Sequence, residues 1–154
     1  MTMLDSTRYW TKFVKESEES NLPKLPYPQE SFGDTQQLAN ELGALVVNNK
    51  KTATCSCTWE YEAEGSELPK TGDRSIILNG KGIPLCIIET INVEYKKFQD
   101  VDKQFSFLEG EGDLTLEYWR REHWKYFSRV LPKIGKQPSL DMPLVCEKFR
   151  VIFR

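Results

Sequence analysis

The stretch Asn49-Lys50-Lys51-Thr52-Ala53-Thr54 decides the fold, because an apolar helical pattern ends there and a strand pattern begins. Before it, four aliphatic residues recur at helical spacing over residues 35–47, and Asn48-Asn49 supplies a left-handed stop. After it, threonine and cysteine over residues 52–58 favour a strand. The sequence therefore predicts a helix-to-strand corner, where reactive side chains can converge.

Further elements are expected on both sides of this corner. Residues 6–17 have the one-sided apolar spacing of an amphipathic helix that braces the domain. Residues 21–32 contain three prolines and form an extended connector, which ends at Asp34, an expected helix cap. Strand patterns and one more helix follow at residues 74–78, 83–98, 116–130 and 144–153.

This order of elements indicates the fold class. Helices before and between several short strands favour a single α+β domain over residues 1–154, built on a mixed, barrel-like sheet with flanking helices. Residues 1–33 form its N-terminal helix and connector. Because the apolar runs are too short to span a bilayer and no signal peptide pattern opens the chain, we expect a cytoplasmic protein with no membrane partner.

The charge and the cysteine count restrict the partners. A net charge of -2 gives no general attraction to a polyanion, so we expect no extended duplex DNA surface. The four cysteines lie mostly in apolar runs and are expected as buried thiols, with only one Cys-x-Cys pair and one histidine in the chain. The sequence therefore predicts no metal site and no cofactor.

Lys51 is the strongest candidate for chemistry in this sequence. A lysine beside apolar neighbours at an element boundary can lose hydration, which would lower its pKa and make it an acid, base or nucleophile. Kept charged, it could stabilise an oxyanion or a phosphate. A solvated lysine at a helix end is the alternative, and it suits Lys50 better. We expect Lys51 to lie outside the core, so that Lys51→Ala changes stability by no more than about 1 kcal/mol.

A second unusual run, Glu109-Gly110-Glu111-Gly112-Asp113, places carboxylates between glycines just before the strongest helix pattern. Glu109 or Glu111 could reach a pocket and act as a general base or read a nucleobase edge. A flexible acidic loop is the alternative. Together the two runs suggest a site made of a lysine, a hydroxyl and a carboxylate.

Other residues are weaker candidates. Glu89 interrupts an apolar run and needs a partner such as Lys51 or Arg74 if it is buried. His123, the only histidine, lies on an apolar helix face, where a core histidine is more common than a catalytic one. Trp59 and Tyr61 follow the lysine stretch closely and could stack on a base, although core packing is their usual role.

These two runs, with Glu117-Tyr118-Trp119-Arg120-Arg121-Glu122-His123-Trp124, resemble the ASCH domain family, whose fold is similar to the RNA-binding PUA domain. The resemblance extends from about Phe32 to Val151. The family signature resembles Gly-x-Lys-x-x-Thr and maps onto Asn49, Lys51 and Thr54. Asparagine best replaces glycine in a left-handed conformation, so the departure at Asn49 is mild.

The resemblance implies a PUA-like mixed β-barrel and a metal-independent hydrolase that acts on a nucleoside, a modified base or a short single-stranded RNA. ASCH relatives include amidohydrolases of acetylated cytidine and ribonucleases. In the amidase version Lys51 activates Thr54 or steadies the oxyanion while Glu111 shuttles the proton. In the ribonuclease version Lys51 stabilises the phosphorane.

The alternative implied by the resemblance is a noncatalytic module that binds RNA or a nucleotide. In that version Lys51 contacts a phosphate and the glutamate-glycine loop reads a base. The predicted catalytic residues are Lys51, Thr54 and Glu111. The predicted substrate-binding residues are Asn49, Trp59, Tyr61, Arg74, Glu89, Glu109 and His123.

Overall fold

The computed structural model describes residues 3–154, with side chains from Ser6 onward. A five-stranded mixed sheet forms its centre, in the order β1 (Gln29–Glu30), β3 (Arg74–Leu78), β4 (Pro84–Lys97), β5 (Pro143–Phe153) and β2 (Ala53–Cys57). β1 pairs with β3 in parallel, and the other neighbours are antiparallel. The α+β class predicted from the sequence is confirmed.

The sheet is open, with β1 and β2 at its two edges, so the expected closure into a barrel is not confirmed. β1 contains only two residues, and it follows a connector that holds Pro23, Pro26 and Pro28. Proline cannot donate a ladder hydrogen bond, so this connector does not lengthen β1.

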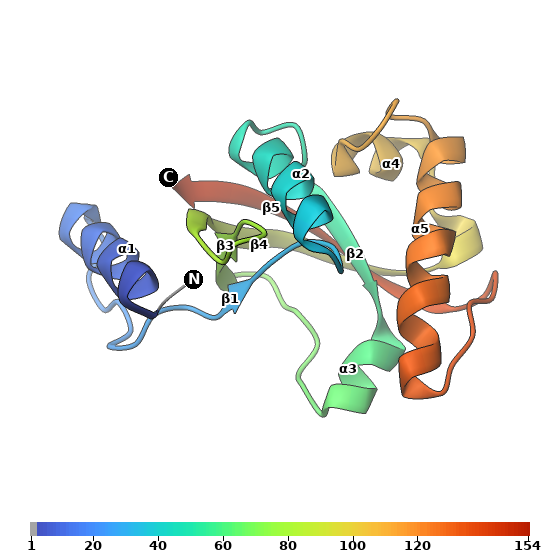
Figure 1. Cartoon of the computed structure of the whole chain (residues 1–154), viewed down its shortest axis with the longest axis horizontal. Helices are drawn as coiled ribbons and strands as arrows, with labels where there is room; N and C mark the ends of the chain where they lie inside the picture. Colours follow the sequence, from blue (N-terminus) through green and yellow to red (C-terminus); the bar gives the residue numbers. More distant parts are fainter. Residues whose placement is uncertain (1–2) are drawn as a thin grey trace.

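Within residues 3–154, five α-helices surround the sheet (Figure 1), and they are α1 (Met3–Glu16), α2 (Gln36–Val47), α3 (Thr58–Glu64), α4 (Lys103–Glu109) and α5 (Leu116–Val130). Two short 3-10 turns follow β4 and α5, at Phe98–Asp100 and Leu131–Ile134. α1 lies at one end of the molecule, whereas α4 and α5 lie at the other. Within the described residues, no helix is long and apolar enough to cross a membrane.

The helices cover the sheet through three apolar clusters. Trp119 and Phe127 of α5 pack with Phe105 of α4 at one face of β2 and β5. Val46 of α2 packs with Phe149 of β5 in a second cluster. The third cluster joins α1 to β3 and β4 through Trp10, Phe13, Ile76 and Ile87.

Three local predictions differ from the structure. Thr35, not Asp34, caps α2, because its side chain accepts a hydrogen bond from the Leu38 amide. Asp34 instead pairs with Arg129 of α5. The strand expected over residues 52–58 ends at Cys57, since Glu60 accepts a hydrogen bond from the Cys57 amide and starts α3. The sequence patterns gave no sign of the seven-residue helices α3 and α4.

Candidate functional site

The corner after α2 turns Lys51 inward. Asn49 adopts a left-handed conformation with φ of 58°, as expected for asparagine at the glycine position. The amides of Lys50 and Lys51 then both donate to the Leu45 carbonyl, at 2.9 and 3.1 Å. This compact stop allows the chain to enter β2 with the side chain of Lys51 directed into the protein.

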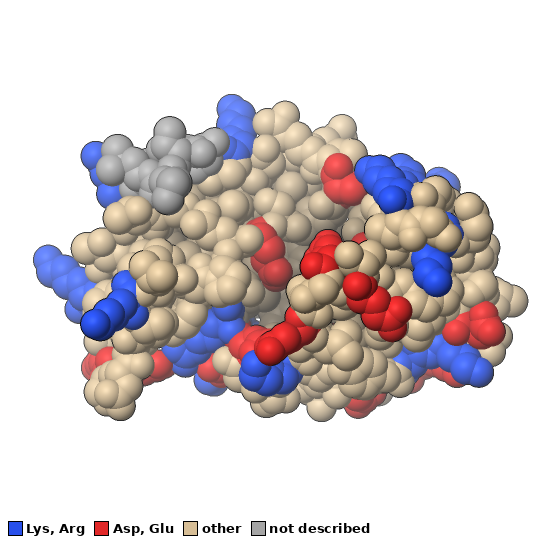
Figure 2. Space-filling model, turned by 90° about the horizontal axis from the view of Figure 1, so that it is seen from below, with Lys and Arg blue, Asp and Glu red and all other residues tan. Residues whose placement is uncertain are grey.

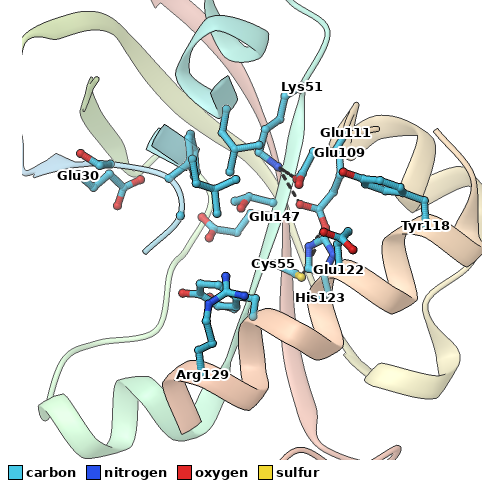
Figure 3. Close-up of a pocket in the computed structure, with 18 of the residues that line it drawn as sticks. Glu30, Lys51, Cys55, Glu109, Glu111, Tyr118, Glu122, His123, Arg129 and Glu147 are labelled. Carbon is cyan, nitrogen blue, oxygen red and sulfur yellow. Dashed lines mark hydrogen bonds and ion pairs between the residues drawn. The ribbon is translucent and has the colours of Figure 1, made fainter. Parts of the chain in front are cut away.

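Lys51 is buried, with 1% of its surface exposed. Its Nζ atom donates to the Ala53 carbonyl at 2.9 Å and to Glu109 Oε1 and Glu111 Oε2 at 2.8 Å each (Figure 3). A lysine ammonium has three protons, so these three bonds use all of them. The sequence placed Lys51 outside the core, and this expectation was wrong.

Glu109 is the other buried member of the cluster, also 1% exposed. Its Oε2 atom accepts a hydrogen bond from the Trp119 indole nitrogen and lies 3.0 Å from His123 Nε2 and 3.5 Å from Cys55 Sγ. Two helices therefore converge on one carboxylate, because Glu109 ends α4 while Trp119 and His123 belong to the first turns of α5. We name Lys51, Glu109, Glu111 and His123 the charged cluster.

Gly110 allows the two carboxylates to reach Lys51. It ends α4 in a left-handed conformation with φ of 70°. A Cβ atom at this position would lie 2.0 Å from the Lys50 carbonyl oxygen, so only glycine fits against the corner.

Both ring nitrogens of His123 face acceptors. Nδ1 lies 2.9 Å from the Trp119 carbonyl, and Nε2 lies 3.0 Å from Glu109. Neither the Trp119 carbonyl nor the ionised Glu109 carboxylate can donate a hydrogen bond. Both ring nitrogens of His123 must therefore carry a proton to form these two bonds. Burial lowers the pKa of His123, but the charge of Glu109 and its hydrogen bond raise the pKa above the ordinary value.

The charges in the cluster alternate and stabilise one another. Burial would lower the pKa of Lys51, yet the charges of Glu109 and Glu111 outweigh burial and raise the pKa well above its usual range. Burial would likewise raise the pKa of Glu109, but Lys51 and then His123 hold that pKa far below its usual range. Of the two alternatives left open by the sequence, a lowered pKa and a lysine that stays charged, the structure agrees with the second, because two carboxylates replace the lost water.

The charged cluster lines one wall of a cavity of about 250 Å³. Thr54 and Tyr61 also line this cavity, together with Tyr118, Tyr126 and Arg129 of α5. Figure 2 shows Asp and Glu side chains gathered around a hollow on one face of the molecule. The cavity thus brings Lys51, Thr54, Tyr61, Glu109, Glu111 and His123, six of the predicted site residues, together.

Four predicted site residues lie elsewhere. Asn49 shapes the corner without lining the cavity. Trp59 packs beside the α5 core, with Lys136 Nζ 5.4 Å from its ring centroid. Glu89 pairs with Arg74 at 2.9 Å and with Arg150 at 2.8 Å, so its partner is the predicted Arg74 and not Lys51.

The sequence analysis missed three acidic residues of the cavity, Glu30, Glu122 and Glu147. Burial, and then the charge of Glu30, raise the pKa of Glu147 to about 7. Glu147 interrupts the apolar run of β5, which was the one signal that could have identified it. Glu30 had no such signal, because its strand contains only two residues.

Cys55, Glu109 and His123 place three possible ligand atoms within 4.8 Å of one another. Sulfur, oxygen and imidazole ligands suit zinc when a fourth ligand is present. Here the Lys51 ammonium contacts Glu109, and His123 Nε2 faces that same carboxylate. These positive groups oppose a bound cation, and burial raises the pKa of Cys55 well above its usual range, so the thiol stays protonated.

The sheet and the buried lysine-carboxylate cluster define an α+β domain with a small charged cavity at the edge strand β2. The chain belongs to the ASCH domain family, whose sequence profile matches residues 29–153. No curated protein matches the chain.

Two solved structures share the whole architecture. A protein from Enterococcus faecalis V583 is 37% identical, with a TM-score of 0.88, and the alignment covers 99% of this chain and 90% of that one. An ASCH domain from Lactobacillus crispatus JV V101 is 28% identical, with a TM-score of 0.89 and coverage of 100% and 97%. The resemblance inferred from the residues is therefore confirmed.

Proposed function

We propose that this protein is a hydrolase that cleaves an amide bond in a small uncharged nucleoside or modified base. The observation that carries the proposal is the charged cluster in the wall of a cavity that also exposes the Thr54 hydroxyl. A volume of about 250 Å³ is at the small end for ligand sites and suits a nucleoside better than a folded RNA.

The charge of the cavity favours an uncharged substrate. Five carboxylates line it against three basic side chains, which are Lys51, His123 and Arg129. Each of these three already has a carboxylate partner, with Arg129 bound to Asp34 at 2.8 and 2.9 Å. Without a spare cation among these residues, a phosphate would meet net repulsion. This argues against the ribonuclease version, in which Lys51 stabilises a phosphorane.

The roles follow from the contacts. Among the described residues the Thr54 hydroxyl has no side-chain hydrogen bond, so it is free to act as the nucleophile. Lys51 holds one oxygen of Glu111, whose side chain is 17% exposed, so that the carboxylate can accept a hydrogen bond from the substrate. Tyr61 and Tyr118 offer ring faces for a base.

A noncatalytic nucleotide-binding module is the second candidate, and one observation favours it. All three protons of Lys51 are used within the protein, so the lysine cannot stabilise an oxyanion unless a bond breaks. In such a module Glu111 and the tyrosines would bind a base without turnover.

A comparison of substrates and variants tests the proposal. Acetylated cytidine, its 5′-monophosphate and single-stranded RNA are incubated with the wild type, and acetylated cytidine also with Thr54→Ala, in the presence and absence of EDTA. We expect turnover of the nucleoside that survives EDTA and disappears in Thr54→Ala, with slower turnover of the monophosphate. Thr71→Ala, in an exposed turn, is the control.

Two outcomes contradict the proposal. Binding of the nucleoside without turnover, measured by calorimetry, would establish the binding module instead. Cleavage of RNA with no action on the nucleoside would restore the ribonuclease version.

A further inference from the structure

The alternation of side chains along β2 separates Thr54 from Glu111. Ala53 and Cys57 pack into the cluster beneath α4 and α5, and Cys55 between them contacts Glu109. Since successive side chains of a strand point to opposite faces, Thr54 projects from the other face. The charged cluster and the Thr54 hydroxyl therefore approach the cavity from different sides of the edge strand.

Glu147 is the carboxylate on the face of Thr54. In the antiparallel pair of β2 and β5, Thr54 lies directly opposite Glu147. Side chains at directly opposed positions share a face, with Cβ atoms about 4.5 to 5.5 Å apart. Both residues line the cavity and the groove that adjoins it. In Figure 3 Glu147 lies between Glu30 and the charged cluster.

The carboxylate of Glu147 is held by one hydrogen bond and keeps other acceptor positions open. Thr90 of β4 donates to Glu147 Oε1 at 3.2 Å, and no other hydrogen bond reaches this carboxylate from the described residues. The titratable groups that face it are Glu30 of β1, Asp73 before β3 and Tyr61 of α3. Among the described residues no basic side chain forms an ion pair with Glu147, in contrast to Glu109 and Glu111.

We propose that Glu147 is the catalytic acid and base that exchanges a proton with Thr54, while Glu111 positions the substrate. This inference rests on the proposed function, because it assigns the proton transfer of that reaction. It replaces the proton-shuttling role that the sequence analysis gave to Glu111.

The reaction proceeds in two halves. Thr54 Oγ1 attacks the acyl carbon as its proton passes to the Glu147 carboxylate, and the carbon–nitrogen bond breaks as Glu147 returns the proton to the leaving nitrogen. An ester of Thr54 and the free amine result. Water then attacks the ester and gives a proton to Glu147, and the ester bond breaks as that proton returns to Thr54 Oγ1.

The surroundings of the two carboxylates fit this division of roles. Burial and Glu30 raise the pKa of Glu147 to about 7, near the pH at which an acid-base group works best. Lys51 holds Glu111 Oε2 by an ion pair at 2.8 Å, which fixes the carboxylate in place as a hydrogen-bond acceptor. Two carboxylates with such different partners are a common way to divide catalytic roles.

The test is the pH profile of kcat/KM for acetylated cytidine. In the wild type we expect kcat/KM to rise with pH and level off above about 7, as Glu147 ionises. Glu147→Gln should lower kcat by about a hundredfold or more and remove the rise. Glu30→Gln removes a like charge and should move the rise to lower pH. Glu94→Gln, half exposed outside the cavity, is the matched control and should follow the wild type.

The outcomes separate the two proposals. An unchanged rate and profile in Glu147→Gln, with Thr54→Ala inactive, would overturn the role of Glu147 and leave the proposed function standing. No turnover by the wild type would overturn both. If Glu147→Gln does not fold, the pH profile of kcat/KM in Glu30→Gln decides. A rise at the same pH as in the wild type would then overturn the catalytic role of Glu147.

Discussion

Lys51 shows how a residue can be both charged and fully buried. Its ammonium exchanges three hydrogen bonds with water for three within the protein, and two of the new acceptors are carboxylates. A buried ion pair does not necessarily stabilise a protein, but removal of one partner leaves a charge without compensation. The chemistry of the site and the stability of the fold are therefore linked at this residue.

We predict that Lys51→Ala lowers the free energy of unfolding by about 3 to 5 kcal/mol, because Glu109 is left buried without its main counter-charge. Urea denaturation measures the change. Lys50→Ala, at an exposed neighbouring position, should be nearly neutral. Equal and small effects of the two substitutions would mean that Glu109 can be neutralised at little cost.

We predict that His123 stays protonated to a higher pH than an ordinary imidazole, because Glu109 raises its pKa above the ordinary value of 6.5. A raised folded-state pKa contributes stability that is complete below the pKa of the unfolded state and is lost as the pH rises through the folded-state pKa. Imidazole nitrogen chemical shifts measure the titration. Glu109→Gln should move it to lower pH, and no movement would show that Glu109 is not the cause.

At the scale of elements, the site depends on the short connection between α4 and α5. Gly110 lets the loop lie against the corner that follows α2, and Glu109 and Glu111 flank it. The cost of a side chain there has two parts, a left-handed backbone and a collision with Lys50. Gly135 has the same left-handed conformation but no neighbour near a Cβ, so it allows the two parts of the cost to be measured separately.

We predict that Gly110→Ala destabilises the protein by clearly more than Gly135→Ala. Both glycines end helical segments, with φ of 70° and 75°. A Cβ at Gly135 meets nothing within 4 Å, so only the left-handed strain of about 1 to 2 kcal/mol remains there. Equilibrium unfolding of both variants measures the difference. Equal losses would show that the loop moves away from the corner freely.

Elements with a long periodic pattern could be predicted from the sequence, whereas the short ones could not. α5 has fifteen residues and a clear apolar face, and β4 has fourteen residues. α3 and α4 have seven residues each, about two turns, which is too short to show a helical repeat of apolar residues. Their positions depend on packing against β2 and α5, which no local pattern describes.

At the scale of the whole molecule, local sequence patterns likewise predicted only part of the candidate site. Lys51, Glu109 and Glu111 could be selected because each stands in an unusual local run. Glu30 could not, and Glu147 had only its place within an apolar run as a signal, because their importance arises from strand pairing that brings distant segments to one cavity. Arg74 was one of two partners suggested for Glu89 and is the one that pairs with it, yet the sheet carries both residues away from the charged cluster.

The position of β5 has a consequence for how the chain acquires its structure during synthesis. β5 lies between β4 and β2 in the sheet, although it follows both in the sequence. β2 therefore stays without its ladder partner until residues 143–153 have left the ribosome. Lys51 likewise cannot exchange water for Glu109 until a segment 58 residues later has emerged. Local helices and the hairpin of β3 and β4 can form early, but the charged cluster and then the pairing of β2 with β5 form later, because both require contacts between distant segments.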